Sequence, residues 1–482
     1  MQRDLTVDEF LNYLYINVKE LFTLKEKSFH FWRNSLISCS KTKNFLFVVV
    51  GDEVLVYDLK EISSDASEPE PCFYLHCPHE ASSSRQGDIN QDMPNVINNV
   101  RCELIGDLEY FITANDCGKV AIYDVQKLNR EPIIYDVQHS AWGLAVSPLR
   151  ILGISSNSHN VNLFHLSPEF KRFKEDYHSP WFRQETLVLE GHEHNIPCIT
   201  FNSSGTLLLS GSIDRSLQIW DITSLSCLCK FYTKLSIWGV KFIDKNAFYH
   251  ISILKHKPGS LIPAQQFGQS PWKPPIMSSS AFLLSHEEDF DDDAVFEGEY
   301  YVHIQDELPK TKVKNYFRTY LRQKPEELFI FTTKFSIVLC AYMGNSQIFP
   351  LVSSKNCFEE PITPRFQALH RINMIECIPE LQSVVCASQS GQLTLLRLIC
   401  TTKILNGNPI YVYSFVPHKI RLTHLVDAPL LGMSVCPLYP GEENPFKRFK
   451  IMLTVYTGKV ISVEVQLSEN LYDTSHIGNI PL

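Results

Sequence analysis

Residues 189–222, LEGHEHNIPCITFNSSGTLLLSGSIDRSLQIWDI, narrow the range of possible folds more than any other part of this chain. Apolar and polar residues alternate over 196–200, and two further apolar runs follow at 207–210 and 217–219. A period of two predicts strands, because successive side chains of a strand point to opposite faces of a sheet. Ser203-Ser204-Gly205 is typical of a turn. The segment therefore predicts three short strands that follow one another closely.

The residues that flank these strands are equally distinctive. Gly191-His192 precedes the first strand, Asp214 follows the small residues 210–212, and Trp220-Asp221 ends the third strand. In order and spacing they resemble one complete WD repeat, the unit that builds one blade of a β-propeller. In that family a His, a strand Ser or Thr, a turn Asp and a Trp form a hydrogen-bonded ladder through the blade. The resemblance implies that this ladder consists here of His192, Ser210 or Ser212, Asp214 and Trp220.

A single blade cannot bury both of its faces, so related segments should recur along the chain. Weaker copies do recur, and two of them end in Tyr57-Asp58 and Tyr123-Asp124, where the good repeat has Trp-Asp. The segments are 46–59, 110–125, 142–166, 189–222, 238–242 continued at 328–331 and 336–340, 374–398, and 433–465. The sequence thus predicts an all-β, seven-bladed WD-repeat β-propeller, and a further blade at 300–326 would make eight.

Three segments do not fit the blade period and set the predicted domain boundaries. Residues 61–95 are polar and turn-rich, which predicts a loop between strands. Residues 255–326 begin Pro-rich, contain an acidic run at 286–293 and end with basic residues, which favours a long loop insertion. We therefore predict an N-terminal helix within 1–27, a propeller over 28–468 and a C-terminal tail over 469–482.

The N-terminal segment is predicted to form an amphipathic helix over residues 6–22, outside the propeller ring. Thr6 and Glu9 make a capping box, and one helical face is apolar. That face is a candidate partner-docking surface formed by Phe10, Leu11, Leu14, Val18, Leu21 and Phe22. Two interpretations of this helix are equally favoured: it caps an open propeller face, or it inserts into the groove of a partner.

Composition argues against several classes of function. The 482 residues carry a formal net charge of −9, whereas proteins that bind a nucleic-acid backbone show a basic surplus or stripe. No apolar run approaches the length of a membrane span, and the N-terminal residues do not resemble a signal peptide. The 14 cysteines lie mostly in apolar, strand-like runs, which favours a reducing compartment, so we expect nucleus and cytoplasm.

The sequence shows no recognisable catalytic, cofactor-binding or metal-binding motif. Cys72, His76, Cys77 and His79 bring four potential zinc ligands together, but the adjacent His76 and Cys77 cannot easily reach one metal ion. His192 and Asp214 suggest an acid–base pair with a nearby Ser, yet their place in the repeat favours the structural ladder. We expect a non-enzymatic scaffold without a cofactor, monomeric within a complex of protein partners.

Several further phrases resemble one fungal family of WD-repeat proteins, named for regulating ribonucleotide reductase transcription. They are FLFVVV before EVLVY at 45–57, SAWGLAV at 140–146, SSN at 155–157, HNIP at 194–197 and IWGVKF at 237–242. The resemblance spans most of residues 30–465. It implies a regulator in the DNA-damage and nucleotide-supply response that acts as a substrate receptor of a cullin-type ubiquitin ligase.

The chain departs from many cullin-ligase receptors in one respect. Those propellers carry an Arg two positions after Trp-Asp, where this chain has Thr223, and Lys60 and Gln126 occupy the matching positions of weaker repeats. The resemblance therefore favours the predicted helix at 6–22 as the element that docks on the ligase adaptor. The alternative function is a scaffold in membrane trafficking or in another multiprotein complex.

Overall fold

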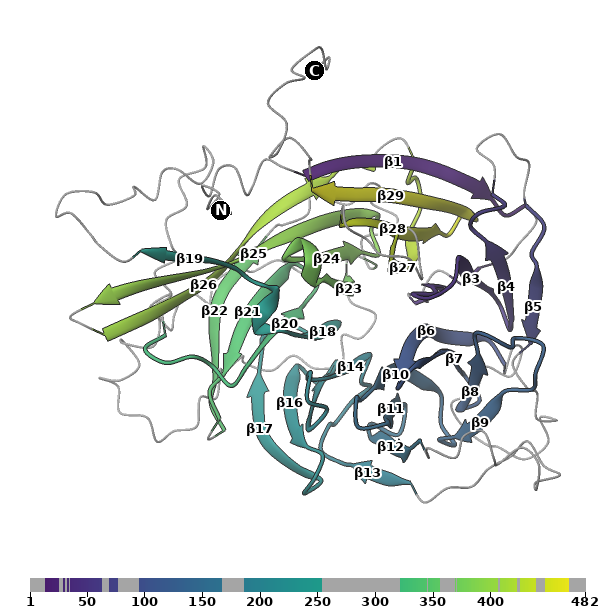
Figure 1. The fold of residues 1–482 in the computed structure, drawn as a ribbon. Coiled ribbons are helices and arrows are strands. Elements are labelled where there is room, and N and C mark those ends of the chain that lie inside the picture. Colours follow the sequence, from purple (N-terminus) through teal and green to yellow (C-terminus); the bar gives the residue numbers. More distant parts are fainter. Residues whose placement is uncertain are drawn as a thin grey trace, which may run out of the picture.

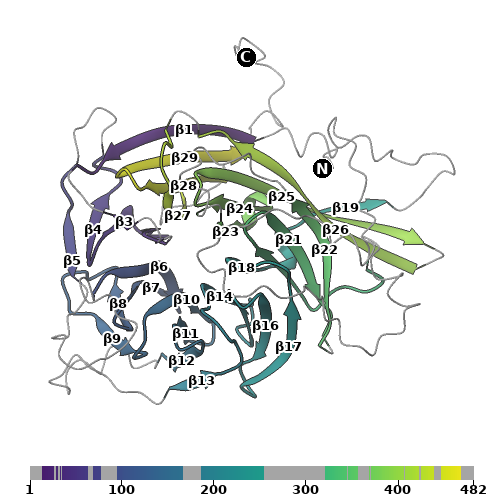
Figure 2. The same cartoon turned by 180° about the vertical axis from the view of Figure 1, so that it is seen from behind.

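Seven β-sheets arranged around a central axis form one closed ring (Figure 1 and, from behind, Figure 2). The computed structural model describes residues 14–25, 29–30, 33, 35–62, 69–76, 95–166, 186–253, 321–344, 346–355, 369, 371–405, 408–422, 425–438 and 447–467. Within these ranges we find no α-helix. The predicted all-β, seven-bladed propeller is confirmed.

Each blade has four antiparallel strands, and its innermost strand lines the axis. In the first four blades the strands follow one another along the chain. Blade 1 contains β2 (Ile37–Cys39), β3 (Phe45–Val50), β4 (Glu53–Asp58) and β5 (Phe73–His76). Blade 2 contains β6 (Ile97–Ile105), β7 (Leu108–Asn115), β8 (Lys119–Asp124) and β9 (Ile133–Asp136). Blade 3 contains β10 (Ala141–Val146), β11 (Ile151–Ser156), β12 (Val161–His165) and β13 (Leu187–Leu189), and blade 4 contains β14 (Cys198–Phe201), β15 (Leu207–Gly211), β16 (Ser216–Asp221) and β17 (Ser226–Tyr232).

The last three blades recruit strands from distant parts of the chain. Blade 5 contains β18 (Gly239–Ile243), β20 (Glu327–Thr332), β21 (Ser336–Tyr342) and β22 (Ile348–Lys355). Blade 6 contains β23 (Ile372–Ile378), β24 (Ser383–Ser388), β25 (Gln392–Leu405) and β26 (Asn408–Ile420), with β19 (Tyr249–Ile253) added. Blade 7 contains β27 (Leu430–Pro437), β28 (Arg448–Val455), β29 (Lys459–Leu467) and β1 (Leu14–Thr23). Short 3₁₀ turns, η1 (Lys245–Ala247) and η4 (Pro379–Leu381), complete the elements.

The middle strands of the blades are apolar on both faces because each blade is packed between two neighbours. In β3, the run FLFVVV contains four consecutive buried residues. Phe47 of this strand stacks on Phe111 of blade 2, with ring centroids 4.0 Å apart and the planes 10° from parallel. Contacts of this kind join neighbouring blades into a continuous core.

The predicted N-terminal helix is wrong, because residues 14–23 form strand β1. β1 pairs antiparallel with β29 over nine residue pairs, from Leu14 opposite Leu467 to Thr23 opposite Lys459. The N-terminal strand thus completes the blade built from the C-terminal strands, and closure of the ring removes an exposed sheet edge. Of the predicted docking face, Leu14, Val18, Leu21 and Phe22 lie in this strand, while Phe10 and Leu11 lie outside the described residues.

The boundaries of the predicted loops also need correction. β5 lies inside the predicted loop 61–95 and forms the outer strand of blade 1. At the predicted 255–326 insertion, β19 ends at Ile253 after pairing in parallel with the outer half of β25. Residues 254–320 lie outside the described residues, and Leu321 then pairs with Tyr411 of β26. The long hairpin of β25 and β26, which projects from the ring in Figure 1, therefore pairs with chain on both sides of this gap: with β19 before it and with Leu321 after it.

Candidate interaction site around the central channel

The structure brings the predicted ladder residues of blade 4 together. His192 Nε2 lies 2.7 Å from Ser210 Oγ, and His192 Nδ1 lies 2.9 Å from Asp214 Oδ2. Trp220 Nε1 donates to the same Ser210 Oγ at 2.9 Å. Ser210 therefore occupies the ladder position that the sequence left open, whereas the Ser212 hydroxyl donates to the Asn195 carbonyl at 2.9 Å.

The burial of its side chains indicates that this ladder has a structural role. An Asp–His–Ser chain resembles a catalytic triad in its order, but His192, Ser210 and Trp220 are 8%, 0% and 2% exposed. No substrate atom can reach a serine hydroxyl that is already bonded on two sides inside a blade. The residue before His192 must be small, because a Cβ at Gly191 would lie 3.0 Å from Cη2 of Trp220.

Asp214 makes the stability of blade 4 depend on pH. Burial alone would raise the pKa of Asp214, but bonds to His192, Ser216 and the Glu193 amide together hold it below its ordinary value of 3.8. A carboxyl group with a lowered folded-state pKa stabilises the fold above its unfolded-state pKa, and that stabilisation is lost as the pH falls through the folded-state value. The contribution of Asp214 is therefore expected to be complete at neutral pH and to decline below pH 3.8.

This pH dependence can be measured by urea unfolding at a series of pH values. We expect the free energy of unfolding of the wild-type chain to fall more steeply below about pH 4 than that of Asp214→Asn. Asp107→Asn, at an exposed position, serves as a control that keeps the wild-type slope. Equal slopes for wild type and Asp214→Asn would contradict the role assigned to this carboxylate.

Two arginine–tryptophan pairs lie at the face of the ring where the inner strands begin. The guanidinium carbon of Arg33 is 5.1 Å from the ring centroid of Trp142, at the start of β10. The guanidinium carbon of Arg371 is 4.2 Å from the ring centroid of Trp238, just before β18. Both tryptophans are partly exposed. A guanidinium held over an aromatic face is a favourable cation–π arrangement.

Arg33 is hydrogen-bonded to residues of different blades at the mouth of the channel. Its Nη1 lies 3.2 Å from Asp116 Oδ1 of blade 2, and its carbonyl oxygen accepts from Gln389 Nε2 of blade 6 at 2.9 Å. Asp116 also accepts from Asn98 at 2.8 Å and from the Ser140 hydroxyl at 2.7 Å. Burial lowers the pKa of Arg33, and the charge of Asp116 partly offsets that effect. Arg33 is itself only 3% exposed, so it acts as an anchor that holds the ring of the partly exposed Trp142 in position.

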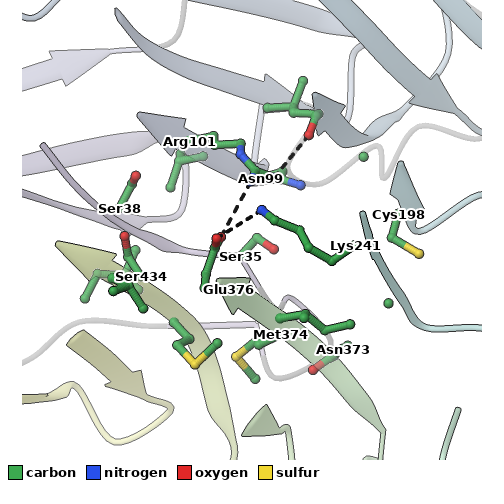
Figure 3. Close-up of a pocket in the computed structure, with 18 of the residues that line it drawn as sticks. Ser35, Ser38, Asn99, Arg101, Cys198, Lys241, Asn373, Met374, Glu376 and Ser434 are labelled. Atoms are coloured by element: carbon green, nitrogen blue, oxygen red, sulfur yellow. Dashed lines mark hydrogen bonds and ion pairs between the residues drawn. The ribbon is translucent and has the colours of Figure 1, made fainter. Parts of the chain in front are cut away.

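A cavity of about 110 Å³ lies in the channel and is lined by the inner strands of all seven blades (Figure 3). Charged side chains from four blades meet there. Arg101 of β6 pairs with the neighbouring Glu103 and reaches across the channel to Glu376 of β23, with Nη2 to Oε1 at 3.6 Å. Lys241 of β18 lies 3.1 Å from Glu376, and Lys41, just after β2, lies 3.2 Å from Glu103.

The two carboxylates of this network are held ionised. Burial would raise the pKa of Glu103, but the charges of Lys41 and Arg101 outweigh burial and lower it. Burial likewise opposes ionisation of Glu376, and the charges of Lys241 and Arg101 lower its pKa. At neutral pH the network therefore combines three cations with two anions, a surplus of one positive charge.

Sequence reasoning missed most of this site. Trp142 and Trp238 are predicted as the starts of strands and belong to the family phrases at 140–146 and 237–242, but nothing in the sequence marks them as contact residues. Arg33, Arg371 and the channel charges carry no local motif. Of the four potential zinc ligands, Cys72 and His76 are described, whereas Cys77 and His79 are not. Across the described part of the chain, His, Cys, Asp and Glu form no group of three or more that could hold a metal ion.

Comparisons with known proteins agree with the fold. The family described as WD domain, G-beta repeat matches residues 183–221, and the family described as CRT10 matches residues 272–404. A WD40 repeat-containing protein of Dictyostelium discoideum is 32% identical over 155 residues, which cover 32% of this chain and 21% of that protein. The chain is a WD40 repeat-containing protein with a seven-bladed propeller.

The comparisons also give two shorter sequence matches and one structural neighbour. The pre-rRNA-processing protein pro-1 of Caenorhabditis elegans is 39% identical over 75 residues, 15% of this chain and 13% of that protein. The periodic tryptophan protein 2 homolog of Schizosaccharomyces pombe is 55% identical over 49 residues, 10% of this chain and 6% of that protein. A chain in a crystal structure of the mitotic checkpoint complex superposes with a TM-score of 0.47 and 11% identity over 92% of each chain. The matched segments span at most 21% of the length of these three curated relatives.

No helix among the described residues has the length and apolar character needed to cross a membrane.

Proposed function

We propose that this chain is a non-enzymatic protein-interaction scaffold whose partner-binding surface is the face that carries the Arg33–Trp142 and Arg371–Trp238 pairs. The observation that carries the proposal is the placement of these pairs beside the channel mouth, where Gly143 and Gly239 line the cavity. Trp and Arg dominate the binding energy of protein interfaces when they sit near the centre of a contact. An aromatic surface that is already held in position loses little side-chain entropy when a partner binds.

The proposed role of this scaffold is regulation of ribonucleotide reductase transcription in the DNA-damage response. The match of residues 272–404 to the CRT10 family supports this role, together with the phrases at 140–146 and 237–242. Those phrases contain Trp142 and Trp238, so the features that suggest the family coincide with the proposed contact surface. In keeping with that role, we propose that the chain acts in the nucleus and cytoplasm and binds proteins, with no direct contact to nucleic acid.

A cullin-type ligase adaptor is the partner that the resemblance suggests, with this chain as its substrate receptor. An N-terminal docking helix cannot support that partnership, because residues 14–23 form β1 inside blade 7. Thr223 stands where many such receptors have an Arg. Within this proposal, the adaptor and the recruited substrate must therefore bind the faces of the propeller.

The functional test replaces the chromosomal gene with one that encodes Trp142→Ala together with Trp238→Ala. We expect ribonucleotide reductase transcript levels after DNA damage to change at least about twofold, because loss of central aromatic contacts abolishes interfaces of this kind. Tyr74→Ala, on the exposed outer strand β5, is the matched control and should behave as wild type. Normal transcript levels with the double variant, present at normal abundance, would refute the transcriptional role. If the proteins that copurify with the wild-type chain were membrane-trafficking proteins, that result would favour the alternative scaffold function.

A further inference from the structure

Basic side chains gather around Trp238, although the chain as a whole carries a net charge of −9. Arg371 lies over the Trp238 ring, and Lys334 lies in the turn between β20 and β21, beside the start of β18. Lys234 lies between β17 and β18, and Arg215 in the turn between β15 and β16. All four are partly exposed. We call these four residues, Arg215, Lys234, Lys334 and Arg371, the basic sector.

Backbone hydrogen bonds hold the loops of the basic sector side by side across blades 4, 5 and 6, which are neighbours in the ring (Figure 1). The Thr233 N–H donates to the Arg215 carbonyl at 2.8 Å, and the Ile372 N–H donates to the Thr333 carbonyl at 3.3 Å. Each of the four basic residues takes part in one of these bonds or is the sequence neighbour of a residue that does. The sector is therefore one contiguous part of the face that carries the Arg–Trp pairs.

The carboxylates of the same loops do not balance these charges. The segments 233–238, TKLSIW, and 332–336, TTKFS, contain no Asp or Glu. In the described loops of blade 4 on this face, Asp214 lies within the ladder, where its carboxylate is 2.9 Å from His192 Nδ1. Glu193 is exposed on the loop before β14. Four cations thus exceed two carboxylates, and the sector presents a positive surplus to a partner.

Aromatic side chains lie among the cations. Trp238 and Phe335 are both partly exposed, and Lys334 Nζ is 5.1 Å from the ring centroid of Phe335. A guanidinium stacked on an aromatic ring, like that of Arg371, can still bind a carboxylate with two N–H groups. Nucleic acid fits less well, because proteins that bind its backbone typically neutralise about 6–10 phosphates and are basic overall. The sector therefore matches a segment in which carboxylates flank an apolar side chain.

The surface around Trp142 differs in charge. The cation beside this ring, Arg33, is 3% exposed and is paired with Asp116. Its charge is therefore compensated inside the protein, and Trp142 offers apolar contact alone. The two halves of the face are thus suited to different parts of one partner.

We propose that the partner segment bound at Trp238 is acidic, with its Asp or Glu side chains on the basic sector and an apolar side chain against Trp238 and Phe335. This inference rests on the proposed function, because it names the chemistry of the partner at the same face. Complementary charge fixes the orientation of the segment and speeds its association. Binding is consequently expected to weaken as ionic strength rises.

The test reverses two charges of the basic sector and measures which proteins copurify with the full chain. We expect Lys234→Glu/Lys334→Glu to recover the partners at least about tenfold less well than wild type, because each substitution replaces an attraction across the interface with a repulsion. Lys60→Glu/Lys127→Glu makes the same change in net charge at exposed positions after β4 and β8, on the opposite face, and should recover the partners as wild type does. Thermal unfolding midpoints close to that of wild type show that both variants keep the fold.

Cross-linking with a carbodiimide identifies the groups in contact, since this reagent joins a lysine amine directly to a carboxylate without a spacer. Mass spectrometry of the wild-type complex is expected to find Lys234 or Lys334 joined to Asp or Glu in an acidic segment of a partner. Cross-links to partners through Lys60 or Lys127 instead would overturn the inference.

The remaining outcomes separate this inference from the proposed function. If Lys234→Glu/Lys334→Glu kept the partners that Trp142→Ala/Trp238→Ala loses, the acidic segment would be refuted and the proposed function would stand. If both variants kept them, both would be refuted. Release of the partners from the wild-type chain by nuclease would show that the basic sector holds a nucleic acid, and the inference would fail.

Discussion

Removal of residues 1–23 is expected to open the propeller and to abolish its cooperative unfolding. The deletion takes away β1, whose nine residue pairs with β29 close the ring. It also removes Phe22, which is 3% exposed and packs against Tyr57 of blade 1 with ring centroids 4.8 Å apart. Loss of the buried Phe22 and the half-buried Leu14, Ile16, Val18 and Leu21 should cost roughly 5 kcal/mol of unfolding free energy, at about 1.5–3 kcal/mol for a fully buried side chain and less for a half-buried one. Loss of the strand also exposes the edge of β29 to aggregation.

A shorter deletion provides the matched control. Removal of residues 1–13 leaves β1 intact, so the thermal unfolding midpoint should stay close to that of the full chain. Circular dichroism and size-exclusion chromatography of the two truncated chains measure the difference. If the chain without residues 1–23 stayed monomeric and unfolded as cooperatively as the control, β1 would not be the element that closes the ring.

Trp220→Ala is expected to be the most destabilising single substitution in blade 4. The indole is 2% exposed and packs in the cluster that joins blades 3 and 4, and its Nε1 donates to Ser210 in the ladder. Truncation of a buried Trp to Ala costs about 3–5 kcal/mol, because a cavity remains where the ring was. Urea unfolding gives this loss directly.

Trp220→Phe separates packing from hydrogen bonding at the same position. It keeps most of the apolar volume and loses the bond to Ser210, so the loss should be only about 1–2 kcal/mol. Tyr232→Ala on β17, where the tyrosine is 37% exposed, should cost less than about 1 kcal/mol. Equal losses for Trp220→Ala and Tyr232→Ala would contradict the assignment of Trp220 to the blade core.

The parts of the fold that could be predicted are those whose pattern is complete within a short segment. Residues 189–222 hold the strand alternation, the turns and the ladder residues of blade 4 together, so that blade could be predicted in detail. The displaced strands of blade 5 could also be predicted. WGVKF at 238–242 supplies only the first strand of a blade, and the next strand-like segments lie at 328–331 and 336–340. β19 was missed, since its pairing with β25 of the next blade depends on chain that is distant in sequence.

The N-terminal strand shows why a local pattern can mislead. Leu14, Val18 and Leu21 match helical spacing, but Leu14, Ile16 and Val18 equally match the period of a strand. A bulge between Glu20 and Phe22 breaks the strand alternation, so the apolar residues at the end of β1 fit a helical period better than a strand period. The pairing partner, β29, decides between the two, and it lies at the other end of the chain.

The candidate site could not be predicted for the same physical reason. Arg33 and Asp116 are 83 residues apart in the sequence, and Lys241 and Glu376 are 135 apart. Charged residues within apolar strands give no indication of a partner until the blades are placed around the axis. Only the closed ring brings their side chains into one channel.

We propose that this protein acts by holding a protein partner on the face marked by Trp142 and Trp238. It is tested most directly by quantitative mass spectrometry of proteins that copurify with the wild-type chain, with Trp142→Ala/Trp238→Ala and with Tyr74→Ala, all expressed at equal levels. We expect a defined set of partners that is retained by Tyr74→Ala and lost from the double variant. The same partners in equal amounts with all three chains would contradict it.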